Sequence, residues 1–379
     1  MGPLALDVET TVSNKGHPFD PRNKLVCWSY AYSEDSGANL WKVSEDWDSG
    51  EHVNSLIGEH DLIVGFNFKF DAQWLIKHGV HIPPTKVWDV QIAEYILSHF
   101  THMYPSLNEI CEKYSLPKKL DVIKLEFWDK GINTDAIPWP ILSKYAKLDA
   151  ELTLQCYLKQ IELMSTKQVM LCKLMCQDMS ILREMEANGL PFDEELCQTR
   201  AKELDVQISE INKTLSAIYP SIPINFGSND HLSAFLYGGV VKEDSKEFIG
   251  YYKSGLKVGQ PKFKNIVIEH HLPRLYTPLK GSEMAKEGNY AVDEGTLRKL
   301  KGKAGIVTML LELAKLEKLN GTYYRGLIKL RETYQWPKGL LHGNYSQAGT
   351  RTGRLSSQKP NLQNMAGDIQ ELFISKYND

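Results

Sequence analysis

The pattern of hydrophobic and polar positions changes character near residue 165. Before that point, short apolar runs predict strands, and stretches of helical periodicity lie between and after them. The predicted strands cover residues 3–9, 24–32, 38–43 and 61–65. The predicted helices lie near residues 51–58, 70–78, 89–100, 106–114 and 139–164. Strands first, and then strands interleaved with helices, predict an α/β domain with a mixed sheet and flanking helices.

The second part of the chain is predicted to be mostly helical. Residues 166–217 carry a long helical pattern that breaks at residues 189–191, Gly-Leu-Pro, and residues 305–334 carry another that is interrupted at Gly321. Residues 222–290 are rich in Gly and Pro and predict strands and loops. Residues 340–365 predict a hairpin that ends in a turn-rich loop, which makes the last segment α+β.

Two acidic residues, Asp7 and Glu9, share one face of the first predicted strand. Because side chains alternate along a strand, Leu4, Leu6 and Val8 point to the opposite face. Two carboxylates on one face raise each other's pKa, and a bound Mg²⁺ or Mn²⁺ ion removes that penalty. The alternative is an edge strand whose acids face solvent.

Further polar residues follow predicted strands or lie on a predicted helix. Asp71 comes after the strand at 61–65, where α/β sites usually lie, and Asp89 precedes a helix. Tyr145 and Asp149 are four residues apart and share one helix face. Asp71 and Asp89 could instead cap helices, and Tyr145 could be a core aromatic residue.

In this order, D-x-E at 7–9, N-x-x-x-D at 67–71 and Y-x-x-x-D at 145–149 resemble the three motifs of the DnaQ-like, RNase H-like 3′–5′ exonucleases. Tyr145, where other members have His, is typical of the DEDDy branch. The resemblance implies that Asp7, Glu9, Asp71 and Asp149 hold two Mg²⁺ ions, which Mn²⁺ can replace. It implies that Tyr145 orients the attacking water.

The resemblance also implies roles for individual carboxylates and for neighbouring residues. Asp7 would bridge both ions, Glu9 and Asp149 would complete one site, and Asp71 would hold the other ion mainly through water. Hydrolysis of a phosphodiester builds negative charge on the attacking and leaving oxygens, which two cations stabilise. The residues that match positions contacting the DNA 3′ end are Thr10, Asn67 and Phe70.

A second group of motifs lies in the last part of the chain. The sequence TRTGRLSS at 350–357, followed by PNLQN at 360–364, could be a basic surface turn, but it resembles a motif of the family A DNA polymerases. Segments at 182–190, 225–232 and 318–323 also resemble that family. The residues that the resemblance places on primer–template DNA are Arg351, Arg354, Gln363 and Asn364.

The resemblance predicts three domains: an exonuclease domain at 1–165, a helical connector and polymerase thumb at 166–335, and the start of a palm at 336–379. The fingers and the catalytic palm acids are expected to be absent, so that the chain cannot polymerise alone. A second polypeptide of a split, phage-type polymerase would then dock at residues 372–374, Leu-Phe-Ile, which we expect to be uncovered. Alternatively, a truncation made in the laboratory would explain why the sequence stops before the catalytic palm acids.

Two other functions stay open. The chain could be mainly a DNA-clamping or assembly subunit with an idle nuclease site, and an RNA-trimming exonuclease of the same branch is a third possibility. Residues 166–379 carry a net charge of +5, against −8 for residues 1–165, and residues 253–286 contain seven Lys or Arg and two acids. This basic segment predicts contact with duplex DNA.

The sequence also bears on where the protein works. No apolar run approaches the roughly 20 residues of a membrane span. The six cysteines are scattered and form no C-x-x-C pair. Both features predict a reducing, cytoplasmic setting, which for a phage protein is the host cytoplasm.

Overall fold

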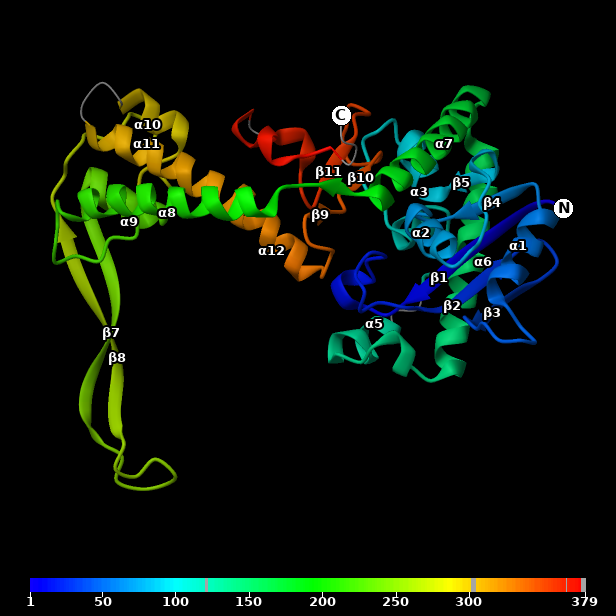
Figure 1. Ribbon diagram of the computed structural model, residues 1–379, viewed down its shortest axis with the longest axis horizontal. Helices are drawn as coiled ribbons and strands as arrows, with labels where there is room; N and C mark the ends of the chain where they lie inside the picture. The colour runs from blue at the N-terminus through cyan, green and yellow to red at the C-terminus, as the bar shows by residue number, and fades with distance from the viewer. Residues whose placement is uncertain (120–121, 301–304, 366, 376–379) are drawn as a thin grey trace. The chain divides into compact units, whose positions relative to one another are not determined.

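The computed structural model describes residues 1–119, 122–300, 305–365 and 367–375. The chain forms two compact units. The first contains Met1–Glu194 and Leu327–Asp379, and the second contains Glu195–Gly326. Figure 1 labels the helices and strands of each unit.

A five-stranded mixed sheet organises the first unit, in the order β3-β2-β1-β4-β5. The strands are β1 (Pro3–Thr10), β2 (Leu25–Ala31), β3 (Ser36–Leu40), β4 (Leu62–Gly65) and β5 (Val87–Asp89). The central strand β1 is antiparallel to β2 and parallel to β4, and Asp7 lies opposite Ser29. The mixed sheet is confirmed, and β5 is a strand that the sequence pattern missed.

Helices flank this sheet. They are α1 (Ser49–Glu59), α2 (Lys69–Lys77), α3 (Val90–Leu97), α4 (Leu107–Lys113), α5 (Val122–Glu126), α6 (Trp139–Leu163) and α7 (Thr166–Asn188), with short 3-10 turns at Ser13–Lys15, Pro84–Lys86, Trp128–Lys130 and Thr134–Ala136. Helix α6 packs along β1, β2 and β3, and α7 packs on α3 and β5. The large side chains Trp28, Trp74 and Trp88 are fully buried between these layers.

The C-terminal segment adds small sheets to the same unit. Strand β6 (Leu190–Pro191) pairs with β9 (Leu340–Leu341), and β10 (Asn344–Ser346) pairs with β11 (Ser356–Gln358), so the hairpin predicted over 340–365 is confirmed. Short 3-10 turns follow at Leu362–Asn364 and Gly367–Leu372.

The prediction that residues 372–374 are uncovered is wrong in part. Leu372 is fully buried, and Phe373 forms an antiparallel bridge with Phe192. Ile374 is exposed, although its N–H donates to the carbonyl of Pro191. The chain leaving α7 supplies the backbone partners, because Asp193 also donates to the carbonyl of Leu372 at 2.8 Å.

The second unit is a helical group that carries one β-ribbon. Its elements are α8 (Glu194–Ser216), α9 (Asn229–Tyr237), β7 (Gly239–Tyr251), β8 (Pro261–Leu272), α10 (Glu294–Leu300), α11 (Gly305–Lys318) and a π-helical turn at Leu319–Tyr324. Helix α12 (Arg325–Thr333) follows, and from Leu327 onward it belongs to the first unit. The π turn contains Gly321, so the predicted interruption is confirmed. Helix α9 corrects the prediction of strands and loops across 222–290.

Packing explains why α9 forms there. Ser228 caps its first turn by accepting from the N–H of His231, and Phe235, Leu236 and Tyr237 are buried in the core of the unit.

The three predicted domains, 1–165, 166–335 and 336–379, rest on resemblance and stay predictions. Among the residues that the structure describes, no helix combines the length and apolar character needed to cross a membrane.

Candidate active site

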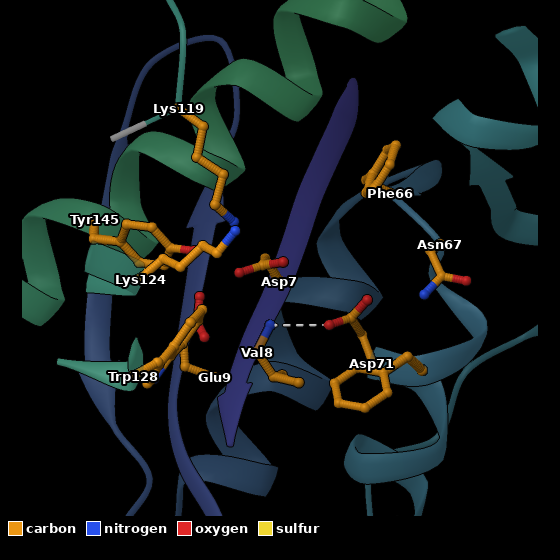
Figure 2. A pocket seen from close by; sticks show the side chains of 11 residues that line it. Asp7, Val8, Glu9, Phe66, Asn67, Asp71, Lys119, Lys124, Trp128 and Tyr145 are labelled. Atoms are coloured by element: carbon orange, nitrogen blue, oxygen red, sulfur yellow. Dashed lines mark hydrogen bonds between the residues drawn. The ribbon is translucent and has the colours of Figure 1, made fainter. Parts of the chain in front are cut away.

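The two acids of β1 lie side by side on the floor of a pocket of about 300 Å³. Leu4, Leu6 and Val8 are buried on the opposite face, as the alternation of the strand requires. Figure 2 shows Asp7 and Glu9 pointing into the pocket from β1. The sequence therefore determines their direction, while the neighbouring strands and helices give the pocket its walls.

Asp71 reaches the same pocket from the first turn of α2. Its Oδ1 accepts the backbone N–H of Val8 at 3.1 Å, which ties the start of α2 to β1. The chain between β4 and α2 is tight: a Cβ on Gly65 would lie 2.2 Å from the ring of Phe68, and Asn67 has a φ of 52°. The interpretation of Asp71 as a helix cap is wrong, since Phe68 is the N-cap residue of α2.

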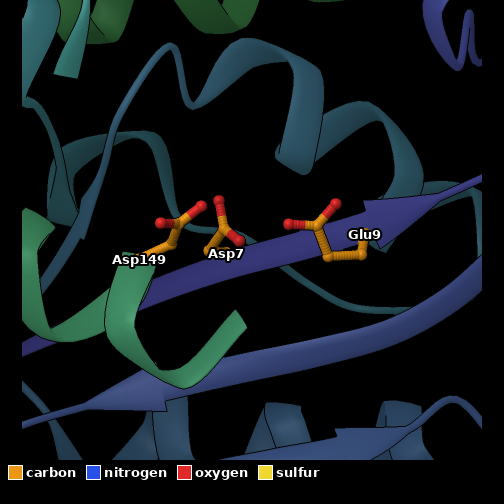
Figure 3. Close-up of side chains that lie close together, drawn as sticks. All are labelled: Asp7, Glu9 and Asp149. Atoms are coloured by element: carbon orange, nitrogen blue, oxygen red, sulfur yellow. The ribbon is translucent and has the colours of Figure 1, made fainter. Parts of the chain in front are cut away.

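Asp149 and Tyr145 come from one face of α6. Asp7, Glu9 and Asp149 each offer a carboxylate oxygen, and these oxygens lie within 4.8 Å of one another (Figure 3). Tyr145 is buried beside them, with the ring of Trp128 packed edge-on against it at 6.3 Å. Residues from β1, α2 and α6 thus converge, as the sequence motifs predicted.

Burial makes these carboxylates hard to ionise. It raises the pKa of Asp7 to about 7, with Asp149 adding to the effect. Burial also raises the pKa of Glu9 and of Asp71 well above their usual range, and in both cases the charge of Asp7 contributes. The pKa of Asp149 is raised by burial and lowered in part by Lys119.

The site contains cationic side chains that the sequence reasoning missed. Lys119 forms an ion pair with Asp149, and its Nζ lies 4.5 Å from the ring centre of Tyr145. Burial lowers the pKa of Lys119, but Asp149 and the other acids outweigh burial and raise it well above its usual range. Lys124 lines the same wall (Figure 2). A basic pair at 118–119, between the second and third motifs, was the available signal.

Asp89 caps a helix, which was the alternative to a role in the site. Its side chain accepts the N–H groups of Gln91 and Ile92 and so caps α3. It also accepts the N–H of Phe68 at 2.7 Å, which fixes the loop that carries Asn67 and leads to Asp71.

The three residues matched to contacts with a DNA 3′ end lie at or beside this pocket. Asn67 and Phe70 line it. Thr10 ends β1, with its side chain against the turn at Gly16: a Cβ there would lie 2.2 Å from Thr10 Oγ1 and 3.2 Å from Phe70. Gly16 has a φ of 71° and no side chain, so Thr10 and Phe70 can both pack against the backbone of this turn.

The C-terminal motif lies on another part of the first unit. Its candidate DNA-contacting residues are all exposed, and none lines the carboxylate pocket as the structure describes it: Arg351, Arg354, Gln363 and Asn364. The Tyr95 hydroxyl donates to the carbonyl of Thr350 at 2.6 Å, and the Tyr104 hydroxyl lies 2.9 Å from Ser356 Oγ. The loop is therefore anchored to α3 and the chain that follows it.

The residues of the pocket fit a divalent cation. Asp7 Oδ2 and Asp149 Oδ1 are buried and make no hydrogen bond within the part of the chain that the structure describes. Hard carboxylate oxygens that face one another are the donor set of Mg²⁺ and Mn²⁺. A bound cation also favours the ionised carboxylates that burial disfavours.

Two family models match the chain. One, described as 3′-5′ exonuclease, covers residues 1–164, and the other, described as DNA polymerase family A, covers residues 264–377.

Relatives align over most of the chain. DNA polymerase I of Synechocystis sp. is 28% identical over 79% of this chain and 26% of its own length. DNA polymerase I of Aquifex aeolicus is 26% identical over 85% of this chain and 49% of its own. The DNA polymerase of Bacillus phage SP01 is 22% identical over 90% of this chain and 38% of its own length. The chain thus spans about a quarter to a half of the length of these relatives.

A solved structure shares the fold. The POL domain of Pol1 from M. smegmatis, in complex with DNA primer-template and dNTP, superposes with a TM-score of 0.67 at 16% identity. The match covers 96% of this chain and 52% of that one. An RNase H-like exonuclease domain followed by a mostly helical thumb accounts for the elements described above.

Proposed function

The chain belongs to the family A DNA polymerases and carries a 3′–5′ exonuclease domain at residues 1–164, and from this premise we propose that its carboxylate pocket removes nucleotides from DNA 3′ ends by two-metal-ion hydrolysis. The observation that carries the proposal is the convergence of Asp7, Glu9 and Asp149 within 4.8 Å, two of them with unpartnered buried oxygens.

Each carboxylate has a separate task in this proposal. When bound, the cations supply charge neutralisation and a water of lowered pKa. Asp7, whose carboxylate lies with those of Glu9 and Asp149 (Figure 3), would help to hold both ions, and Glu9 and Asp149 would complete one of the two sites. Asp71, whose Oδ1 accepts the N–H of Val8, lines the same pocket and would hold its ion mainly through water.

We assign the site to the DEDDy branch because Tyr145 stands at the third motif. Burial raises the pKa of Tyr145 above its usual value, with Glu9 and Asp149 adding to the effect, so its hydroxyl stays protonated at neutral pH. A neutral hydroxyl can donate one hydrogen bond and accept another, so it is able to orient a water. Its role is positioning rather than general base catalysis.

The substrate proposal rests on the pocket walls. The aromatic side chains of Phe66 and Phe70 and the amide side chain of Asn67 line the pocket. Aromatic stacking tolerates any base, which suits removal of any 3′-terminal nucleotide. Arg351 and Arg354, on their anchored loop, are proposed to contact primer–template DNA as bidentate donors to phosphate or base acceptors.

The test is digestion of a 3′-labelled single-stranded oligodeoxynucleotide in Mg²⁺ or Mn²⁺. Asp7→Ala should lower the rate by several orders of magnitude, and EDTA should abolish it. Tyr145→Phe should lower turnover by roughly 10- to 1000-fold with DNA affinity unchanged. Asp46→Ala, an exposed acid outside the pocket, is the control. Full digestion in EDTA, or by Asp7→Ala, would exclude the proposal.

The other functions give different results in that assay. An idle nuclease in a DNA-clamping subunit predicts binding without digestion by the wild-type chain in either metal. An RNA-trimming enzyme predicts faster digestion of a ribonucleotide strand of the same sequence.

We also propose that polymerisation needs the rest of the family's fold, either in a longer chain or in a second polypeptide. Adding a candidate second polypeptide should give a complex on size-exclusion chromatography that extends primers. If no complex forms and no extension occurs, the two-polypeptide arrangement is excluded.

A further inference from the structure

The β7–β8 ribbon is a long two-stranded arm within the second unit. Twelve or more residues per strand, at about 3.3 Å each, give a length of roughly 40 Å. Its strands pair only with each other in the sheet described (Figure 1). A lone two-stranded ribbon is marginally stable in water. An arm of this length therefore carries exposed side chains on both faces that a partner could cover.

Charge is divided sharply along the ribbon. The distal half, residues 246–264, contains five lysines and one glutamate. The proximal half, residues 239–245 and 265–272, contains one lysine and three acids. An even scatter of charge would leave both halves near neutral, so the distal half is the place where a polyanion would be attracted.

The two halves also differ in how their charges are used. In the proximal half Lys242 pairs with Glu269 at 3.0 Å, and His270 with Glu243 at 2.8 Å. Across the described residues, the distal lysines form no ion pair; they are Lys246, Lys253, Lys257, Lys262 and Lys264. Their charge is therefore available to a ligand.

Aromatic side chains lie among these lysines. Lys257 and Lys262 both lie within 6 Å of the ring centre of Tyr252, at 5.9 and 5.8 Å. Lys264 follows Lys262 by two residues and so shares its face. On the other face Phe248 lies opposite Phe263, and each is half exposed.

The structure narrows the basic segment that the sequence predicted over 253–286. Arg274 donates to the carbonyl of Tyr237 at 3.0 Å, and Lys286 forms an ion pair with Asp230. These two cations stabilise the base of the ribbon and the loop beside α9. The ligand-binding part is the distal half of the ribbon.

We propose that the distal half of the β7–β8 ribbon binds the phosphate backbone of duplex DNA, with Lys257, Lys262 and Lys264 as its principal contacts. A two-stranded β-ribbon fits the major groove, which places cations on its strands within reach of the phosphates on either side. The inference depends on the proposed function only in taking DNA as the ligand. It places duplex binding on a surface separate from the carboxylate pocket.

The test compares the full chain with K257Q/K262Q/K264Q by fluorescence anisotropy on a labelled blunt duplex over a range of salt. Removing three phosphate contacts should reduce the slope of log affinity against log salt by about 2.7, at about 0.9 per contact. The control K159Q/K167Q/K173Q removes the same charge from exposed positions on α6 and α7 and should leave the slope unchanged.

Two further measurements separate this inference from the nuclease proposal. The ribbon variant should digest a short single-stranded oligonucleotide at the wild-type rate, and Asp7→Ala should bind the duplex with the wild-type slope. A ribbon variant with the wild-type slope would overturn the inference. The inference would also be overturned if the ribbon variant bound duplex DNA normally but no longer bound anionic phospholipid vesicles. The same holds if it bound duplex DNA normally but lost a dimer that the wild-type chain shows in light scattering.

Discussion

At the scale of the residue, Asp7 shows how local sequence and burial combine. Its strand places it beside Glu9, and α6 brings Asp149 against it. Burial and these neighbours raise its pKa to about 7. Lys119, paired with Asp149, supplies an internal positive charge. A divalent cation held at the same oxygens would supply more positive charge, so metal binding and ionisation of the acids would be linked.

This linkage predicts a pH dependence of stability without metal. The folded chain keeps a proton on Asp7 that the unfolded chain releases between its ordinary pKa of 3.8 and about 7. Stability is therefore lost as pH rises through that window. We expect Asp7→Asn in EDTA to melt above wild type at about pH 8, and the difference to shrink toward about pH 4.

Differential scanning calorimetry over this range measures the effect, with the exposed Asp46→Asn as the control. An Asp7→Asn protein that melts below wild type at the higher pH, in EDTA, would show that the Asp7 charge is stabilising and that the site is not short of positive charge.

At the scale of the element, α3 positions the loop that carries Arg351 and Arg354. Tyr95 is fully buried in α3, and its hydroxyl donates to the carbonyl of Thr350. The chain after α3 adds a second link, because Tyr104 N–H donates to the carbonyl of Ala348 at 3.2 Å. The polymerase-like motif is thus fixed by residues of the exonuclease domain.

Tyr95→Phe should release this loop without disturbing the pocket. Loss of one buried hydrogen bond costs about 1 kcal/mol of stability. Amide exchange should accelerate over residues 348–356, and digestion of single-stranded DNA should stay unchanged. Tyr30→Phe, which removes an exposed hydroxyl bonded to Asp35, is the control. Equal exchange in both variants would mean that the Thr350 contact does not hold the loop.

At the scale of the whole molecule, the pocket and the ribbon belong to different compact units. A ligand that binds one folded unit stabilises that unit by mass action. Mg²⁺ should therefore slow amide exchange in β1 and α6 and leave exchange in α9 and α11 as it was. Hydrogen exchange with and without Mg²⁺ measures this, and Asp7→Asn should lose the effect. Equal protection of α9 and α11 from exchange would mean that the two units unfold together as one cooperative unit.

The sequence alone could identify those elements whose signal is local. The alternation around Asp7 and the helical period that joins Tyr145 to Asp149 are both present in the structure, since each is set by the geometry of a single strand or helix. The strand β5 and helix α9 were missed, because three residues show no period and α9 lies in a stretch rich in Gly and Pro.

The sequence by itself determined which residues are candidates for the chemistry: the acids of three motifs, their order and the face of the element on which each lies. Only the tertiary structure decided that Lys119 joins them, that Asp89 caps a helix while Asp71 reaches β1, and that Leu372 is covered by the chain after α7. It also decided which lysines of the basic segment form no ion pair with the described residues. The physical reason is that partners and burial depend on contacts between segments far apart in the chain, and no local periodicity records them.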